Sequence, residues 1–296
     1  MSETQQSMNP SRQFDELPDA PPKRKIRLSW SGKLGIAVLV FWAIIVVIGP
    51  SISPYHEAEF LEESLFIVPG SDEKYPDTDF QPPSRIVLLG SDYMGRDTLS
   101  RILFGARTTI GISFIATILA YLIGVTLGIA AAVGYRFQYR GFTIIELDTV
   151  LSRLNDALLS IPSIMLGLVM IAALGSTIPL LILLTGIIYA ASVFRIARSL
   201  GQEVMVSDFV EAARVRGEGL WWIITREILP NVAMPLATDF GLRFVWVILF
   251  ISALSFLGLG VQPPMSDWGS MVKENLPGLI YGSIAPIVPS LAIATL

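Results

Sequence analysis

Five uncharged runs divide the sequence, at residues 34–55, 108–135, 157–194, 244–266 and 275–296. Each is long enough to cross a bilayer as a helix, which takes about 20 predominantly apolar residues. The third run holds 38 residues, and "LGSTIPLL" at its centre supplies the glycine and proline of a turn, so it predicts two helices. The pattern as a whole predicts an all-α polytopic membrane protein with about six transmembrane helices.

The composition supports lipid as part of the solvent. Of the residues, 52% are hydrophobic and 16% are charged, whereas a soluble domain carries about 25% charged residues. The first run follows "KRKIRLSWSGK", as a signal-peptide core would, but it is longer than such a core and no A-x-A-like cleavage site follows it. We therefore expect 34–55 to be a retained first transmembrane helix. The next helices are expected at about 106–134, 150–174 and 179–200, from Asn231 to "FLGLG", and at 275–296.

The distribution of charge predicts how these helices are oriented. Residues 1–33 form a polar, proline-bearing tail, expected to be disordered, that ends in a basic flank. Basic residues mark the cytoplasmic ends of membrane helices, so we place the N-terminus in the cytoplasm. Residues 56–105 are then a periplasmic loop, and 106–296 are a core domain with a cytoplasmic loop at 201–231. The acidic balance of the first loop agrees, since residues 53–101 hold ten acidic and four basic side chains. The basic residues that mark the cytoplasmic side are Lys23, Arg24, Lys25, Arg27, Lys33, Arg136, Arg140, Arg195 and Arg198.

The sequence excludes several kinds of chemistry. It has no cysteine, so disulfides and thiol catalysis are excluded, and its single histidine, His56, is expected on the loop surface. The phosphate-binding pattern G-x-x-x-x-G-K-[ST] is absent, as are the hydrolase patterns H-E-x-x-H and G-x-S-x-G. We expect no enzymatic activity, no cofactor and no metal in this chain, and no nucleic-acid partner.

The segment "SDFVEAARVRGEGLWWIITREILPN", residues 207–231, is polar and rich in arginine although it lies between apolar runs. It predicts two short helices. Ser207 or Asp208 would cap the first, and Gly217 and Gly219 would take positive φ at its end. The side chains expected to share one face are Phe209, Ala212 and Ala213. The residues alone leave two alternatives open: an amphipathic connector at the membrane interface, or a docking helix for a soluble partner.

This segment resembles the EAA motif of ABC importer permeases, which reads E-A-A, three residues, glycine, nine residues, an apolar residue, one residue and Leu-Pro. The matching residues are Glu211, Ala212, Ala213, Gly217, Leu229 and Pro230, while Glu227 stands at the apolar position. "LGSDYMGRDTLSRILFGAR" at 89–107 and "FLGLGVQPPMSDWGSMV" at 256–272 are similar to segments of the dipeptide, oligopeptide and nickel importer permeases. There they precede helix two and follow helix five. The resemblance implies the type I ABC importer permease fold.

The resemblance also implies partners. Two permease subunits, the second usually a different chain, would form the pathway. Two cytoplasmic ATPase subunits would carry ATP and Mg, and a periplasmic or lipoprotein solute-binding protein would deliver the substrate. The chain would lie in a bacterial inner membrane, with peptides as the most common cargo and nickel, opines and oligosaccharides left open. The residues implied to contact the ATPase are Glu211, Ala212, Ala213, Arg214, Gly217 and Glu218. Because such permeases continue past a sixth span, we expect the chain to be cut short at Leu296.

A second candidate group precedes helix two. Charges of alternating sign at spacings of four predict a short helix there. Such a helix would be either self-paired at the outer surface or part of the docking surface for a binding protein or the outer gate. The residues of this periplasmic signature are Asp92, Gly95, Arg96, Asp97 and Arg101.

Two residue pairs within the spans leave alternatives open. Asp239 and Arg243 lie four residues apart in helix five, either as a structural pair near the cytoplasmic interface or as residues lining the pathway. Gly124 and Gly128 permit close contact in helix two, either within the chain or between subunits. From a different class, an ATP-independent secondary transporter would need mid-membrane carboxylates or internal repeats. The first four helices show no mid-span carboxylate, and the sequence shows no convincing repeat.

Overall fold

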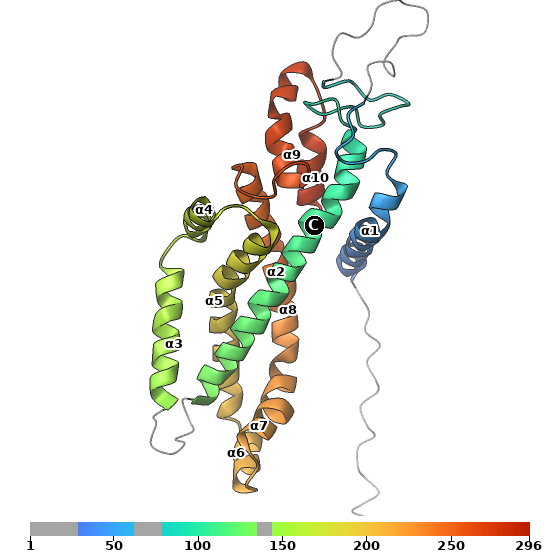
Figure 1. Ribbon diagram of the computed structural model, residues 1–296. Coiled ribbons are helices and arrows are strands. Elements are labelled where there is room, and N and C mark those ends of the chain that lie inside the picture. Colours follow the sequence, from blue (N-terminus) through green and yellow to red (C-terminus); the bar gives the residue numbers. More distant parts are fainter. Residues whose placement is uncertain (1–28, 62–78, 135–143) are drawn as a thin grey trace, which may run out of the picture. The chain divides into compact units, whose positions relative to one another are not determined.

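The computed structural model describes residues 29–61, 79–134 and 144–296 (Figure 1). The chain divides into two units, residues 1–37 and 38–296. The predicted tail, much of the acidic stretch of the first loop, and Arg136 and Arg140 lie outside the described residues. The regular elements of the described ranges are all helices, which confirms the predicted fold class.

Four helices are long and apolar enough to span a membrane. They are α1 (Trp30–Ile52), α2 (Thr98–Gly134), α5 (Ile178–Met205) and a continuous helix at Leu220–Phe256. The last comprises α7 (Leu220–Trp222), the π-helical segment η3 (Ile223–Ile228) and α8 (Leu229–Phe256). At 1.5 Å per residue, the 37 residues of α2 reach about 55 Å. The fifth predicted helix begins at Leu220 instead of Asn231, and so starts inside the predicted cytoplasmic loop.

The third predicted helix, 150–174, is broken. Its residues fall in α3 (Ile144–Leu159) and α4 (Ser163–Leu174), which meet at 85°. Pro162 stands at the break, where its ψ of 123° lies outside the helical region. Proline favours a break here because it has no N–H to donate to a helical hydrogen bond and disfavours helical backbone at the residue before it. The predicted turn at "LGSTIPLL" is confirmed, since α4 ends at Leu174 and α5 begins at Ile178.

The sixth predicted span is also broken. Residues 275–296 hold a 3₁₀ turn, η4 (Leu276–Tyr281), and the short helix α10 (Ile287–Ala294). Gly282 turns the chain in the left-handed region, with a φ of 71°. The eight residues of α10 reach about 12 Å, well short of the roughly 30 Å apolar core of a bilayer. The described residues thus provide four spans, or five if α3 and α4 together form one, instead of the predicted six.

Helices α2 and α5 pack closely through small residues. A Cβ atom on Gly124 would lie 2.6 Å from the Cβ of Val193, and one on Gly128 would lie 2.7 Å from the backbone oxygen of Phe194. Both approaches are too close for any side chain larger than hydrogen. The glycine pair of α2 therefore serves packing within the chain, the first of its two predicted alternatives.

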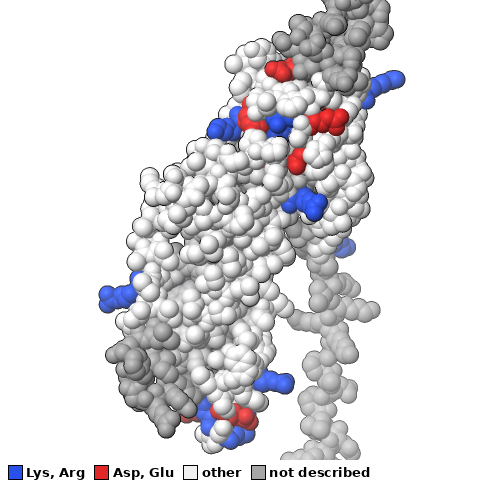
Figure 2. Space-filling view, viewed as in Figure 1, with Lys and Arg blue, Asp and Glu red and all other residues white. Residues whose placement is uncertain are grey.

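Buried apolar side chains form three clusters in residues 38–296. One lies where α2, α5 and the α7–α8 helix approach α6 (Asp208–Val215), below called the α6 end. A second joins α4, α5 and α8, and a third surrounds Trp268 at the start of α9 (Trp268–Asn275), below called the α9 end. Charged side chains gather mostly toward these two ends, with a broad uncharged surface between them (Figure 2). The fold thus places two polar regions at opposite ends of an apolar bundle.

Candidate functional site

Helix α6 is anchored to the spanning helices by one apolar face. Val210 and Ala213 are fully buried, in a cluster with Ile129 and Val133 of α2 and Ala197 of α5. The predicted face is therefore wrong in part. Ala213 points inward, but Phe209 and Ala212 are exposed. Val210 and Ala213, three residues apart, are the side chains of α6 that are buried against the bundle. The other side chains of α6 are exposed or half-buried.

The end of α6 is a Schellman turn. The N–H of Gly217 donates to Arg214 O at 2.9 Å, and the N–H of Glu218 donates to Ala213 O at 3.1 Å. Gly217 has a φ of +84°, as predicted. Gly219 does not take positive φ: its φ is −73°, and it precedes α7. At the other end, Ser207 stands at the N-cap position, but its side chain makes no capping hydrogen bond, so that prediction is also wrong.

The outward side of this loop exposes apolar side chains beside charges. Val215 is 85% exposed and Trp221 is 76% exposed, and Glu211 and Arg216 are exposed with them. Arg214 and Glu218 are half-buried. We call the exposed apolar residues the loop surface. They are Val206, Phe209, Val215, Leu220 and Trp221. Such a surface is typical of a site that contacts another protein or the surface of a membrane.

The α9 end contains a buried network of ion pairs. Arg101 donates to Asp92 at 2.5 Å and to Glu274 at 3.1 Å, and Arg96 donates to Asp92 at 2.8 Å. Asp92, Arg96 and Arg101 are buried, and Glu274 is largely so. Burial of this kind requires that charges be paired. The predicted alternation of charges thus does produce pairing, although Arg101 pairs with Asp92 and Glu274 instead of Asp97.

The predicted helix over this signature is wrong. Residues 92–97 form a turn, in which Gly95 has a φ of +72°, and α2 begins at Thr98. Asp97 accepts the backbone N–H of Ser100 at 2.8 Å and its hydroxyl at 2.5 Å. It therefore acts as the N-cap of α2, where a carboxylate satisfies free backbone donors and complements the helix dipole.

Asp267 caps α9 in the same way. Its carboxylate accepts the N–H of Ser270 at 3.1 Å and the hydroxyl of Thr109 at 2.8 Å. The indole of Trp268 then donates to Ile102 O at 3.1 Å. Complete burial raises the pKa of Asp267 above its ordinary value, and the hydrogen bonds to the carboxylate oppose that rise. The stretches 89–107 and 256–272, far apart in sequence, are therefore joined in one buried structure.

The two charges within α8 are paired. Arg243 donates to Asp239 at 3.2 Å, and the hydroxyl of Tyr121 on α2 donates to the same carboxylate. The rings of Phe240 and Phe244 pack against Phe114 of α2. The pair thus faces α2 and is surrounded by aromatic rings.

Comparison with known proteins identifies the family. The family described as "Binding-protein-dependent transport system inner membrane component" matches residues 124–296, more than half of the chain. The chain belongs to this family. The match includes α6, the Asp239–Arg243 pair and α9.

Relatives of this permease carry names from peptide transport. The chain is 38% identical, over 66% of its length, to a putative peptide transport system permease of Brucella suis. It is 33% identical to the glutathione transport system permease GsiD of Pectobacterium atrosepticum, over 77% of this chain and 73% of the relative. It is 28% identical to a dipeptide transport system permease of Haemophilus influenzae, over 89% of this chain and 83% of the relative. The chain spans 63% of the Brucella relative's length.

Sequence reasoning missed three partners in this permease. Glu274 and Tyr121 complete the two charge clusters, and Asp148 binds Arg198 through two bonds of 2.6 and 2.7 Å that tie α3 to α5. The sequence pattern indicates Arg198 only as a marker of orientation. The available signal was an acidic residue ahead of the third apolar run and a basic one after it, which lie at the same end because that run predicts two helices.

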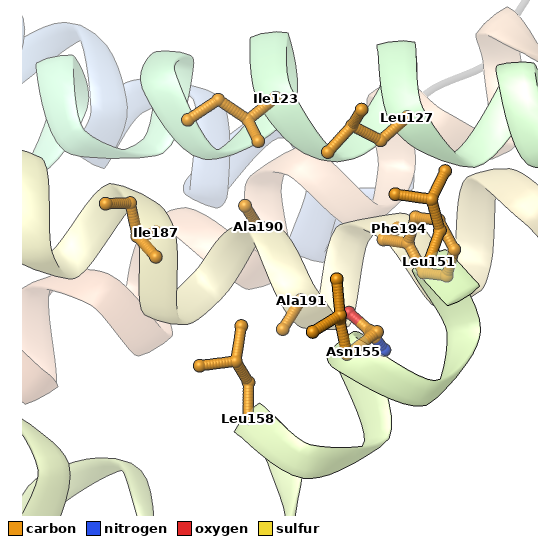
Figure 3. A pocket seen from close by; sticks show the side chains of 10 residues that line it. Ile123, Leu127, Leu151, Asn155, Leu158, Ile187, Ala190, Ala191 and Phe194 are labelled. Atoms are coloured by element: carbon orange, nitrogen blue, oxygen red, sulfur yellow. The ribbon is translucent and has the colours of Figure 1, made fainter. Parts of the chain in front are cut away.

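An apolar groove lies between α2, α3 and α5 (Figure 3). Its volume is about 240 Å³, and nine of its ten lining residues are apolar. The tenth, Asn155, is buried, and its Nδ2 has no hydrogen-bond partner in the part of the chain that the structure describes. Because a polar solute would find almost no partners there, the groove is a poor candidate for a transport site.

Proposed function

We propose that this permease is a transmembrane subunit of an ATP-driven, binding-protein-dependent importer of di- and oligopeptides. The family and the names of its relatives, which refer to peptides, dipeptides and glutathione, support this proposal. The chain would lie in a bacterial inner membrane and act with a second permease subunit. Two ATPase subunits would bind ATP and Mg, and a solute-binding protein would deliver the peptide. The permease itself would hydrolyse nothing.

The observation that carries the proposal is the way α6 is held. Val210 and Ala213 fix it to the ends of α2 and α5, while Val215 and Trp221 are exposed. A push on the loop surface would therefore move the spanning helices, because close-packed interfaces transmit displacement. A connector that only rested on lipid would not need this anchoring. We infer that the loop surface docks an ATPase subunit, with Glu211, Ala212 and Gly217 in its groove.

We infer the orientation from the basic residues at the α6 end. Arg195, Arg198, Arg214, Arg216 and Arg226 all lie at the α6 end of the described helices. The positive-inside rule would place this end in the cytoplasm, where ATP is available. The α9 end, with its buried ion pairs, would face the binding protein.

An affinity pull-down tests the docking. The tagged permease would be purified in detergent from cells that express the whole transporter. Val215→Asp is the sharpest variant, because Val215 is so exposed that the change leaves the fold intact. We expect it to release the ATPase and to retain the second permease. Ile280→Asp, at an equally exposed position of the α9 end, is the matched control and should retain both. Absence of an ATPase from the wild-type preparation would overturn the proposal.

A further inference from the structure

The Asp239–Arg243 pair lies deep in the membrane region. The hydroxyl of Tyr121 fixes its depth, because it donates to Asp239. Tyr121 stands at the middle of the uncharged run 108–135, with 13 residues before it and 14 after it. At 1.5 Å per residue, about 20 Å of uncharged helix lies on either side. The pair is therefore not near the cytoplasmic interface, which was one of its two predicted positions.

Stability does not account for charges at this depth. Charged side chains in the bilayer core are costly and usually face a bundle interior or a water-filled cavity. Replacing a buried ion pair by apolar residues of similar volume is often neutral or stabilising. The Nε of Arg243 is in addition buried and has no hydrogen-bond partner among the described residues.

The hydrogen-bonding groups of Asp239 are all used, whereas those of Arg243 are not. This difference indicates which kind of ligand the pair could bind. Each carboxylate oxygen of Asp239 is already bonded, one to Tyr121 and the other to Arg243. The guanidinium of Arg243 has five N–H donors, of which Nη2 bonds Asp239, while the buried Nε has no partner among the described residues. The side chains of Arg243 and Asp239 are 17% and 15% exposed, so part of the pair is accessible although Nε is not. The free capacity is therefore that of a donor for an anion.

We propose that Arg243 binds the C-terminal carboxylate of a peptide during its passage through the membrane. The inference rests on the proposed importer function and adds a residue that contacts the substrate. Between substrates Asp239 neutralises the guanidinium, held in place by Tyr121. A passing carboxylate binds the exposed part of the same guanidinium, whose planar fork suits carboxylate geometry. The positive charge of Arg243 thus always has a carboxylate beside it. The aromatic rings of Phe114, Phe240 and Phe244 contact the peptide's apolar side chains.

The absence of cysteine from the chain makes a direct test possible. Arg243→Cys introduces a single thiol, which methanethiosulfonate reagents convert to a mixed disulfide with release of methanesulfinate. The aminoethyl reagent adds a cation, and the sulfonatoethyl reagent adds an anion. Both need a water-accessible thiol. The variant would be studied in the complete transporter in proteoliposomes, with uptake of labelled trialanine as the readout. Leu122→Cys, 61% exposed and adjacent to Tyr121, is a control at the same depth.

The proposal predicts a specific set of outcomes. Arg243→Cys should reduce trialanine uptake about tenfold or more, as expected for the loss of a charge-assisted hydrogen bond. The cationic reagent should restore uptake, and the anionic reagent should react without restoring it. Trialanine should slow the modification, whereas trialanine amide, which lacks the carboxylate, should not. Leu122→Cys lies outside the ion pair and should keep trialanine uptake close to that of the wild type, with or without either reagent.

Two results would overturn the proposal. One is wild-type uptake by the unmodified Arg243→Cys variant. The other is a thiol that neither reagent modifies, with or without ATP, as expected if the pair were only structural. The second readout needs no transported peptide, so it decides the question even where the wild-type transporter fails to take up trialanine. Failure of the wild type alone would count against the proposed peptide importer instead.

Discussion

Arg101 donates to Asp92 across 2.5 Å, and both side chains are almost fully buried although they lie nine residues apart. Breaking one member of such a pair leaves an uncompensated charge, which typically costs about 3–5 kcal/mol. We therefore expect Arg101→Met to lower the thermal unfolding midpoint of the purified permease clearly. Arg101→Lys should have an intermediate effect, because lysine keeps the charge but lacks the fork that reaches both Asp92 and Glu274.

This effect is measured as the midpoint of thermal unfolding in detergent, with size-exclusion chromatography to detect the folded protein that remains after heating. Arg226→Met is the control, since Arg226 is exposed at the α6 end and should tolerate the change. Equal midpoints for Arg101→Met and the wild type would show that the network does not stabilise the fold.

Gly217 should be replaceable only by residues that tolerate its backbone. Its φ of +84° costs an ordinary L-residue about 1–2 kcal/mol, whereas asparagine visits this region more readily. We expect Gly217→Ala to weaken ATPase retention in the pull-down, and Gly217→Asn to weaken it less. Gly219→Ala is the matched control two residues on, because Gly219 has a φ of −73° that alanine adopts freely. A stronger loss with Gly219→Ala than with Gly217→Ala would contradict this account of the loop.

The spans were predictable because lipid imposes one simple requirement, a long uncharged helix. The lengths of the uncharged runs located α1, α2, α5 and α8 to within a few residues. The exceptions are two helix starts, at Thr98 and Leu220, which lie before the predicted ones. The breaks were harder to find. Pro162 ends one helix, yet Pro235 lies inside α8, so a proline in an apolar run does not by itself decide the question.

The polar contacts were predictable only where they are local. The Asp239–Arg243 pair follows from helical spacing. The bond from Arg101 to Glu274 joins residues 173 positions apart, and no periodicity in the sequence indicates it. The role of Asp97 was misread for a related reason. Asp97 stands four residues before Arg101, which suggests an ion pair, but it also stands just before a helix, where the free N–H groups of the first turn are stronger local partners.

The α2–α5 contact should be intolerant of any added side chain at Gly128. A Cβ there would lie 2.7 Å from the backbone oxygen of Phe194, and backbone cannot move aside as a side chain can. We expect Gly128→Val to give aggregated protein or a much lower unfolding midpoint. Gly111→Ala, in the same helix with open space around it, should be neutral or stabilising by up to about 1 kcal/mol. A well-folded Gly128→Val permease would show that α2 and α5 do not approach this closely in the membrane.

Asp267 predicts how stability depends on pH. Burial raises its pKa in the folded protein above the value near 3.9 expected in an unfolded chain. The folded state therefore binds the proton more tightly, so stability is greatest below the unfolded pKa and is lost as pH rises through the folded pKa. Asp267→Asn cannot titrate but can still cap α9, because asparagine is also a favoured N-cap. We expect the wild type to lose stability relative to Asp267→Asn as pH rises from about 4 through that window. Unfolding midpoints of both proteins in detergent between pH 4 and 8 test this. A wild type that gains stability over the variant with rising pH would mean that the bonds from Thr109 and Ser270 outweigh burial.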